Sequence, residues 1–109
     1  MSGIRWQDPW YSIEGDSGQQ DPLDAQLQKE MPAGHILAGR AARAVGRRRG
    51  NDDILYILDG GGPAYAVVHL IWRRTREEDP AWPATYVFVN AEDVMANCIE
   101  VDSADYERD

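Results

Sequence analysis

Residues 53–72 read DILYILDGGGPAYAVVHLIW, and the rest of the chain is arranged around them. Two runs rich in β-branched and aromatic residues flank a connection of three glycines and Pro63. Such a pattern is typical of an antiparallel β-hairpin. Both runs are apolar at consecutive positions, which favours strands covered on both faces. We therefore expect this hairpin in the middle of the domain.

A helix is predicted before the hairpin, beginning at Asp21. Asp21 can cap it, and Pro22 suits the first helical position. Leu23, Leu27 and Met31 recur every four residues and form a narrow apolar stripe, which the following Pro-Ala-Gly ends. Because the helix is short, we expect it to need a sheet to pack against.

Residues 36–49 allow two interpretations. In a helix, Arg40, Arg43 and Arg47 would share one face. In a strand, Arg43, Val45 and Arg47 would point one way and the small residues between them the other. Two glycines count against a helix, and a lone hairpin needs a third strand for stability. We interpret this segment as a strand.

The last third predicts one strand and one helix. Residues 85–89 (TYVFV) have strong β propensity, and Asn90 can cap a helix in which Ala91, Val94, Cys98 and Val101 share a face. The predicted class is α+β: an N-terminal helix, a three- to four-stranded antiparallel sheet around the central hairpin, and a C-terminal helix. We expect an aromatic N-terminal segment (1–20), a single domain (21–101) and an acidic tail (102–109).

Size and charge exclude several function classes. A chain of 109 residues with a net charge of −8 is one acidic domain, which disfavours nonspecific binding to nucleic acid or anionic lipid. The charge is uneven: two basic and six acidic residues in 1–39, eight and three in 40–76, one and ten in 77–109. One cysteine and no apolar run of spanning or signal-peptide type predict a cytoplasmic protein without membrane association.

Few residues offer chemistry. His69, Cys98 and Asp53 supply the residue types of a base, a thiol nucleophile and an orienting carboxylate. His69 lies in an apolar run, where a structural histidine is the default, and Cys98 lies on the apolar stripe of the last helix. His35 and His69 have no spacing that indicates an acid–base pair. We predict no catalytic residue, with this trio as the reserve candidate.

Metal, cofactor and nucleic-acid sites receive little support. The histidines and aspartates lack metal-ligand spacing, and the glycine triplet has no following helix, lysine or Ser/Thr of a phosphate loop. We expect no metal and no cofactor. The arginine-rich stretch could follow phosphates, but the acidic balance opposes it, and nucleic acid is the third-ranked partner. The residues concerned are Arg40, Arg43, Arg47, Arg48 and Arg49.

Four segments together resemble a group of small bacterial proteins without an assigned activity. They are residues 34–39 (GHILAG), 51–56 (NDDILY), 65–72 (YAVVHLIW) and 82–85 (WPAT). The resemblance covers about residues 20–95 and is most specific at 67–72. It implies that 36–49 belongs to the sheet, and it carries no catalytic residues.

The expected function is a small acidic protein-interaction module, such as an immunity or antitoxin-like inhibitor of a cationic partner. Opposite charge would speed association, and exposed tryptophans serve as interface anchors. The candidate contacts are Trp6, Trp10, Trp82, Glu77, Glu78 and Asp79. For Trp6 and Trp10, packing on the sheet is the preferred interpretation, and an exposed patch that docks a partner is the alternative. A ligand-binding protein or enzyme using His69 in a pocket is the second hypothesis. Pairing of an edge strand to form a homodimer is compatible with the sequence.

Overall fold

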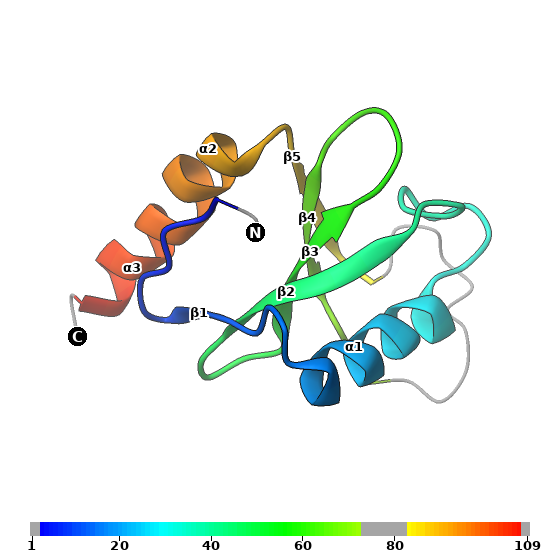
Figure 1. Ribbon diagram of the computed structural model, residues 1–109, viewed down its shortest axis with the longest axis horizontal. Helices are drawn as coiled ribbons and strands as arrows, with labels where there is room; N and C mark the ends of the chain where they lie inside the picture. The colour runs from blue at the N-terminus through cyan, green and yellow to red at the C-terminus, as the bar shows by residue number, and fades with distance from the viewer. Residues whose placement is uncertain (1–2, 73–82, 108–109) are drawn as a thin grey trace.

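The computed structural model describes residues 3–72 and 83–107. Its strands form one five-stranded antiparallel sheet in the order β1-β2-β3-β4-β5, each strand pairing with the next in the chain (Figure 1). The elements are β1 (Trp10–Ser12), α1 (Ser17–Glu30), β2 (Ala42–Arg48), β3 (Asp53–Leu58), β4 (Tyr65–His69), β5 (Thr85–Phe88), α2 (Ala91–Val94), the π-helical turn η1 (Met95–Ile99) and α3 (Glu100–Glu107). The predicted α+β class is confirmed.

The sheet has five strands where three to four were predicted. The additional strand is β1, whose Trp10, Tyr11 and Ser12 pair with Arg48, Arg47 and Gly46. A strand of three residues is too short to be predicted from local sequence, and this segment is extended because it pairs with β2. The predicted aromatic segment 1–20 therefore contributes to the sheet at its end.

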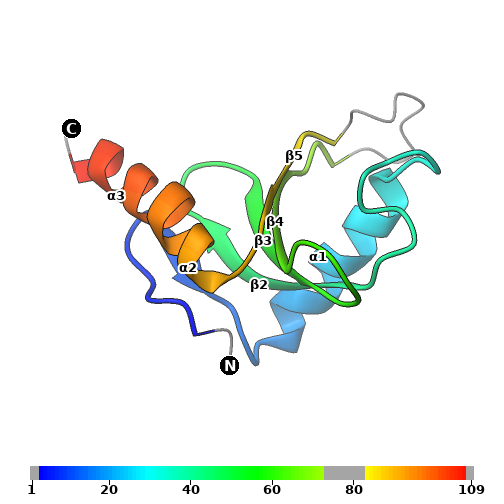
Figure 2. The ribbon, with the colours of Figure 1, turned by 90° about the horizontal axis from the view of Figure 1, so that it is seen from above.

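The two faces of the sheet carry separate cores, as the consecutive apolar residues of the central hairpin predicted. Helix α1 covers one face, and the continuous helix of α2, η1 and α3 covers the other (Figure 2). Ile54, Tyr56 and Val68 lie under α1, whereas Leu55 and Val67 lie under the C-terminal helix. Alternate residues of β3 and β4 therefore serve opposite cores.

Helix α1 begins at Ser17, before the predicted start at Asp21. Asp16 holds the N-terminal position, where its carbonyl accepts the backbone N–H groups of Gln19 and Gln20. Pro22 consequently lies inside the helix. Contacts with β2 stabilise this early start, since the buried Gln20 side chain donates to the Ala44 carbonyl at 2.7 Å.

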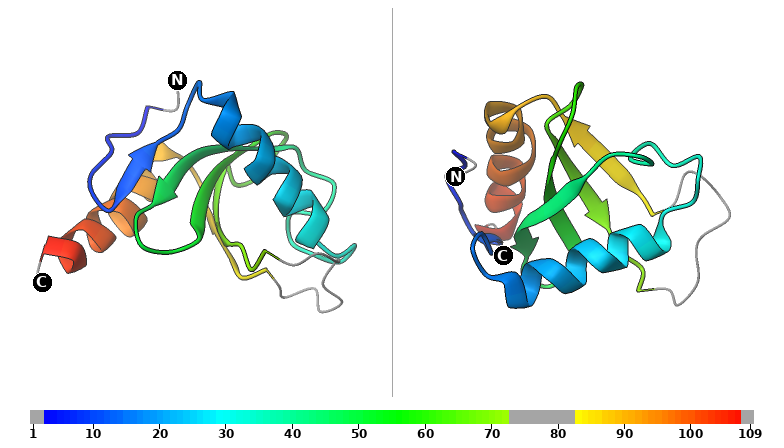
Figure 3. Two further views of the ribbon diagram at one scale, coloured as in Figure 1. Left: turned by 90° about the horizontal axis from the view of Figure 1, so that it is seen from below. Right: turned by 45° about the vertical axis from the view of Figure 1, so that its right-hand side comes forward.

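The predicted strand in residues 36–49 is present only as β2, because residues 34–39 form turns. β2 lies between the short strand β1 and the central strand β3 (Figure 3). Its register shifts between Ala44 and Gly46, which marks a β-bulge. A Cβ at Gly46 would overlap the Trp6 ring, so glycine lets the N-terminal segment pack directly on the sheet.

The C-terminal helix differs from its prediction after its start. Asn90 accepts the N–H of Asp93, so the predicted cap is present. The π-helical turn then adds a residue to one turn and rotates the rest of the helix. Ile99 consequently takes the buried face, and Val101, predicted to be buried, is exposed. The helix continues to Glu107, so residues 102–107 are helical rather than a tail.

Candidate functional site

A row of polar side chains crosses four strands on the face that the C-terminal helix covers. Trp10 of β1 is opposite Arg48 of β2, and Asp53 of β3 is opposite His69 of β4. The register therefore places these four residues side by side, although they come from distant parts of the chain.

Hydrogen bonds and ion pairs connect this row to the helix above it. His69 Nδ1 lies 2.7 Å from Asp53 Oδ1, and Arg48 Nη1 lies 3.5 Å from Asp53 Oδ2. Arg48 is also 3.8 Å from Asp102 of α3, whose Oδ2 accepts the Trp10 indole N–H at 2.8 Å. Two carboxylates thus share one guanidinium, which leaves a local excess of negative charge when His69 is neutral.

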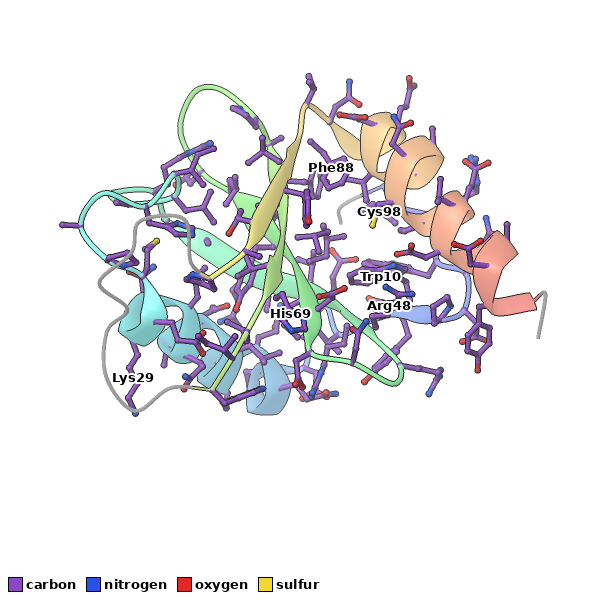
Figure 4. All side chains as sticks on the ribbon, turned by 180° about the vertical axis from the view of Figure 1, so that it is seen from behind. Trp10, Lys29, Arg48, His69, Phe88 and Cys98 are labelled. Carbon is purple, nitrogen blue, oxygen red and sulfur yellow. The ribbon has the colours of Figure 1, made fainter. Side chains whose placement is uncertain are left out.

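Three residues of the polar row, Trp10, Arg48 and Asp53, line a hollow of about 610 Å³, which we call the β5 groove. It lies between the C-terminal helix and the β4–β5 side of the sheet (Figure 4). Its floor is formed by Trp10, Arg48 and Asp53, its sheet side by Val67, Tyr86 and Phe88, and its helix side by Asn97, Cys98 and Asp102. The groove combines an apolar wall with paired charges at one end, as many binding sites do.

Cys98 lies in the groove wall but is unsuited to nucleophilic chemistry. Burial and the nearby Asp102 raise the pKa of its thiol to about 12, despite the opposing charge of Arg48. The thiol is 3.9 Å from Asp102 Oδ2 and acts as a weak donor. Because the thiolate is the reactive form, a protonated thiol at neutral pH argues against a Cys98 nucleophile.

His69 is accessible rather than sealed in the core. Its side chain is 46% exposed, and Asp53 fixes the ring through Nδ1. His35 is different: it is buried, and its Nε2 contacts the Pro83 carbonyl at 3.0 Å and Thr85 Oγ1 at 3.1 Å. The structure thus pairs His69 with Asp53, and the groove is lined by Asp53 and Cys98 but not by His69. The buried His35 has a structural role.

Strand β5 presents an exposed apolar surface beside the groove. Tyr86 is 67% exposed and Val89, just after the strand, is 68% exposed, with Val87 less so. No charged residue occurs in β5. Charged side chains often protect the edge strands of sheets, and β5 has none, so this short apolar edge is a candidate contact surface.

The predicted aromatic anchors are placed differently. Trp10 is buried with 1% of its surface exposed, which fits packing rather than an exposed anchor. Trp6 is half-buried and packs over Gly46. The other predicted contacts, Trp82, Glu77, Glu78 and Asp79, lie outside the described residues.

The arginine stretch is engaged within the protein. Arg43 donates to Asp21 and Asp24 at 2.7 and 2.8 Å, which raises the pKa of its guanidinium. The other four also have partners: Arg40 the Asp59 carbonyl, Arg47 the Gln19 side chain, Arg48 Asp53, and Arg49 both Asp8 and the Tyr11 ring. A phosphate backbone would have to compete with these partners, which argues against a nucleic-acid surface.

Asp102 and Tyr86 were not singled out from the sequence. Asp102 lies at the groove because the π-helical turn rotates α3, and the sequence contains no pattern that predicts this turn. Tyr86 is identified by its exposure, which the strong β propensity of its strand does not predict. Within residues 3–72 and 83–107, no group of three or more His, Cys, Asp or Glu side chains is placed to hold a metal ion.

The geometry defines a small α+β protein with an open groove between its last strand and its last helix. In comparisons with known proteins, no family model, curated protein or solved structure matched the chain. Among the described helices, none has both the length and the apolar character needed to cross a bilayer.

Proposed function

We propose that this protein is a non-catalytic interaction module of the cytoplasm that binds a basic partner protein through the surface formed by β5 and the C-terminal helix. An immunity or antitoxin-like inhibitor is the specific form of this proposal. Nuclease toxins are basic because they bind nucleic acid, and a small acidic inhibitor would associate with them rapidly.

The observation that carries the proposal is the adjacency of an exposed apolar strand and an acidic helix. Residues 91–107 contain six acidic residues and no basic one. Of these, Glu92, Glu100 and Asp105 are exposed. Tyr86 and Val89 supply an apolar centre, and tyrosine is enriched among the residues that dominate binding energy. An apolar centre with a charged surround is the usual composition of a protein interface.

The test is affinity capture from the native lysate with tagged protein and two charge-reversal variants. Glu92→Lys/Glu100→Lys changes the C-terminal helix, and Asp52→Lys/Asp59→Lys makes the same change of charge at two exposed positions in the turns on either side of β3. We expect wild type and the turn variant to retain one near-stoichiometric basic protein that high salt weakens, and the helix variant to lose it. Retention of nothing by the wild type, or equal loss by both variants, contradicts the proposal.

A second candidate function is binding of a small molecule at His69. The supporting observation is the exposed imidazole, held by the 2.7 Å contact with Asp53 at the end of the groove. That contact orients the ring and leaves Nε2 available as a donor or acceptor. The same arrangement occurs in sites that transfer protons, so a small enzyme belongs to this alternative.

A thermal-shift screen with wild type and His69→Ala tests the second candidate. Asp52→Asn is the matched control, since Asp52 is exposed in the adjacent turn. A compound that raises the melting temperature of wild type and of the control, but not of His69→Ala, supports a small-molecule site. Equal shifts in all three proteins, or no shift with any compound, contradict it.

A further inference from the structure

We propose that the free edge of β5 binds an extended, lysine- or arginine-bearing segment of the partner by adding it as a sixth strand of the sheet. This inference rests on the proposed function and specifies how the basic partner is recognised. In this binding mode, main-chain hydrogen bonds supply affinity and alternate side chains supply specificity.

Two residues of β5 have backbone N–H and C=O groups that point away from β4. The N–H of Leu58 in β3 donates to the carbonyl of Ala64, just before β4, and the N–H of His69 in β4 donates to the carbonyl of Ala84, just before β5. Hydrogen-bonding direction alternates along an antiparallel strand, so Tyr65, Val67 and His69 face β5. Tyr65 pairs with Phe88 and Val67 with Tyr86, and His69 bonds Ala84 just before β5. The N–H and C=O groups of Thr85 and Val87 therefore point away from the sheet.

The outer side of β5 has no strand paired with it among the described residues, and the sheet ends at this strand. The Val89 N–H is occupied by Asp93 Oδ2 at 2.9 Å, which limits the free edge to the strand itself. The edge has neither proline nor charge, the two features that usually block strand addition.

The acidic residues near β5 favour a basic segment as the sixth strand. A sixth strand would lie beside β5, and the helix that directly follows and contacts β5 has Glu92 and Asp93 in its first turn and no basic residue in 91–107. Tyr86 pairs with Val67 and shares the groove face, so incoming residues aligned with Tyr86 would direct side chains toward that face. A basic side chain could contact both the tyrosine ring and the carboxylates. A second copy of this chain carries −8 and would bring like charges together, which disfavours it as the occupant.

The experiment uses substitutions at Val87, whose N–H lies on the outer side. Val87→Pro removes that donor without removing a hydrogen bond to β4, and proline is tolerated on edge strands. Val87→Ala is the matched control, because it shortens the side chain and keeps the N–H. Thermal unfolding of both variants checks that each is folded.

The probe is a capped heptapeptide of alternating lysine and valine, followed through the amide resonances of the full-length protein. We expect saturable shifts at the amides of Thr85 and Val87, with affinity for Val87→Ala within about twofold of wild type and about tenfold weaker for Val87→Pro. The same peptide with glutamate for lysine, or with N-methylated backbone nitrogens, should not bind.

Three results would overturn the strand-addition proposal. They are the absence of saturable shifts at these amides up to about 1 mM peptide, equal affinity of the two Val87 variants, and a wild-type dimer that Val87→Pro dissociates. If both Val87 variants capture the basic partner equally well from lysate, the proposed function stands and strand addition fails. If wild type captures no partner, the proposed function fails independently.

Discussion

Replacing Glu30 with alanine removes a buried carboxylate that positions the end of β4. The side chain is fully buried, and its two oxygens accept the backbone N–H groups of Ile71 and Trp72 at 2.9 and 2.8 Å. Gln26 donates a third hydrogen bond at 2.7 Å. Trp72 has a φ of 59°, in the left-handed region that a bulky residue rarely adopts, so the carboxylate stabilises a strained turn.

The expected cost follows from the two backbone donors. Each N–H that loses its partner away from water costs about 1–3 kcal/mol. Removing the desolvation cost of the carboxylate offsets part of this, so we expect a net loss of about 3 kcal/mol in the free energy of unfolding. A domain of this size is stabilised by about 5–16 kcal/mol in total. The melting temperature should therefore fall by about 13 °C.

Urea unfolding followed by tryptophan fluorescence measures this loss. Gln28→Ala is the control, because Gln28 is an exposed neighbour on α1 and should change stability by under about 0.5 kcal/mol. Glu30→Gln keeps one acceptor and should give an intermediate loss. If Glu30→Ala remains within about 1 kcal/mol of wild type, the carboxylate does not stabilise the turn in the way described.

Three further predictions concern the cores. Cys98, with its pKa raised to about 12 by burial, should react with a thiol reagent at pH 8 at least about a hundredfold more slowly in native than in urea-unfolded protein; similar rates would refute it. Gly46→Ala should cost about 1–3 kcal/mol because its methyl group would displace Trp6, whereas Gly61→Ala, with open space around it, should be nearly neutral in the same denaturation assay. Tyr56→Phe removes a buried 2.7 Å bond to an α1 carbonyl and should cost about 1–2 kcal/mol, and an unchanged unfolding midpoint would exclude that role.

The parts of the fold that were predictable are those with local signals. The apolar runs and glycine connection of residues 53–72 identify β3 and β4, and Asn90 identifies the start of the last helix. The stripe of Leu23 and Leu27 identifies the buried face of α1. Each depends on side chains close together in the sequence, where propensity and periodicity are informative.

The groove could not be predicted because it depends on register and on one irregular turn. Pairing of β1 with β2 brings Trp10 beside Arg48, and pairing of β3 with β4 brings Asp53 beside His69. The π-helical turn then brings Asp102 above them. None of these relations has a local pattern, since each joins residues distant in the chain. Exposure of Tyr86 is likewise a property of the finished sheet.

Affinity capture with two double variants shows whether the surface of β5 and the C-terminal helix binds a basic protein. Tyr86→Ser/Val89→Ser removes the exposed apolar groups beside the groove, and Ile36→Ser/Ile71→Ser removes two exposed apolar groups that lie outside β5 and the C-terminal helix. We expect wild type and the Ile36/Ile71 variant to capture one basic protein near stoichiometrically, and the β5 variant to lose it. Capture by both variants alike, or capture of no basic protein by the wild type, would contradict this expectation.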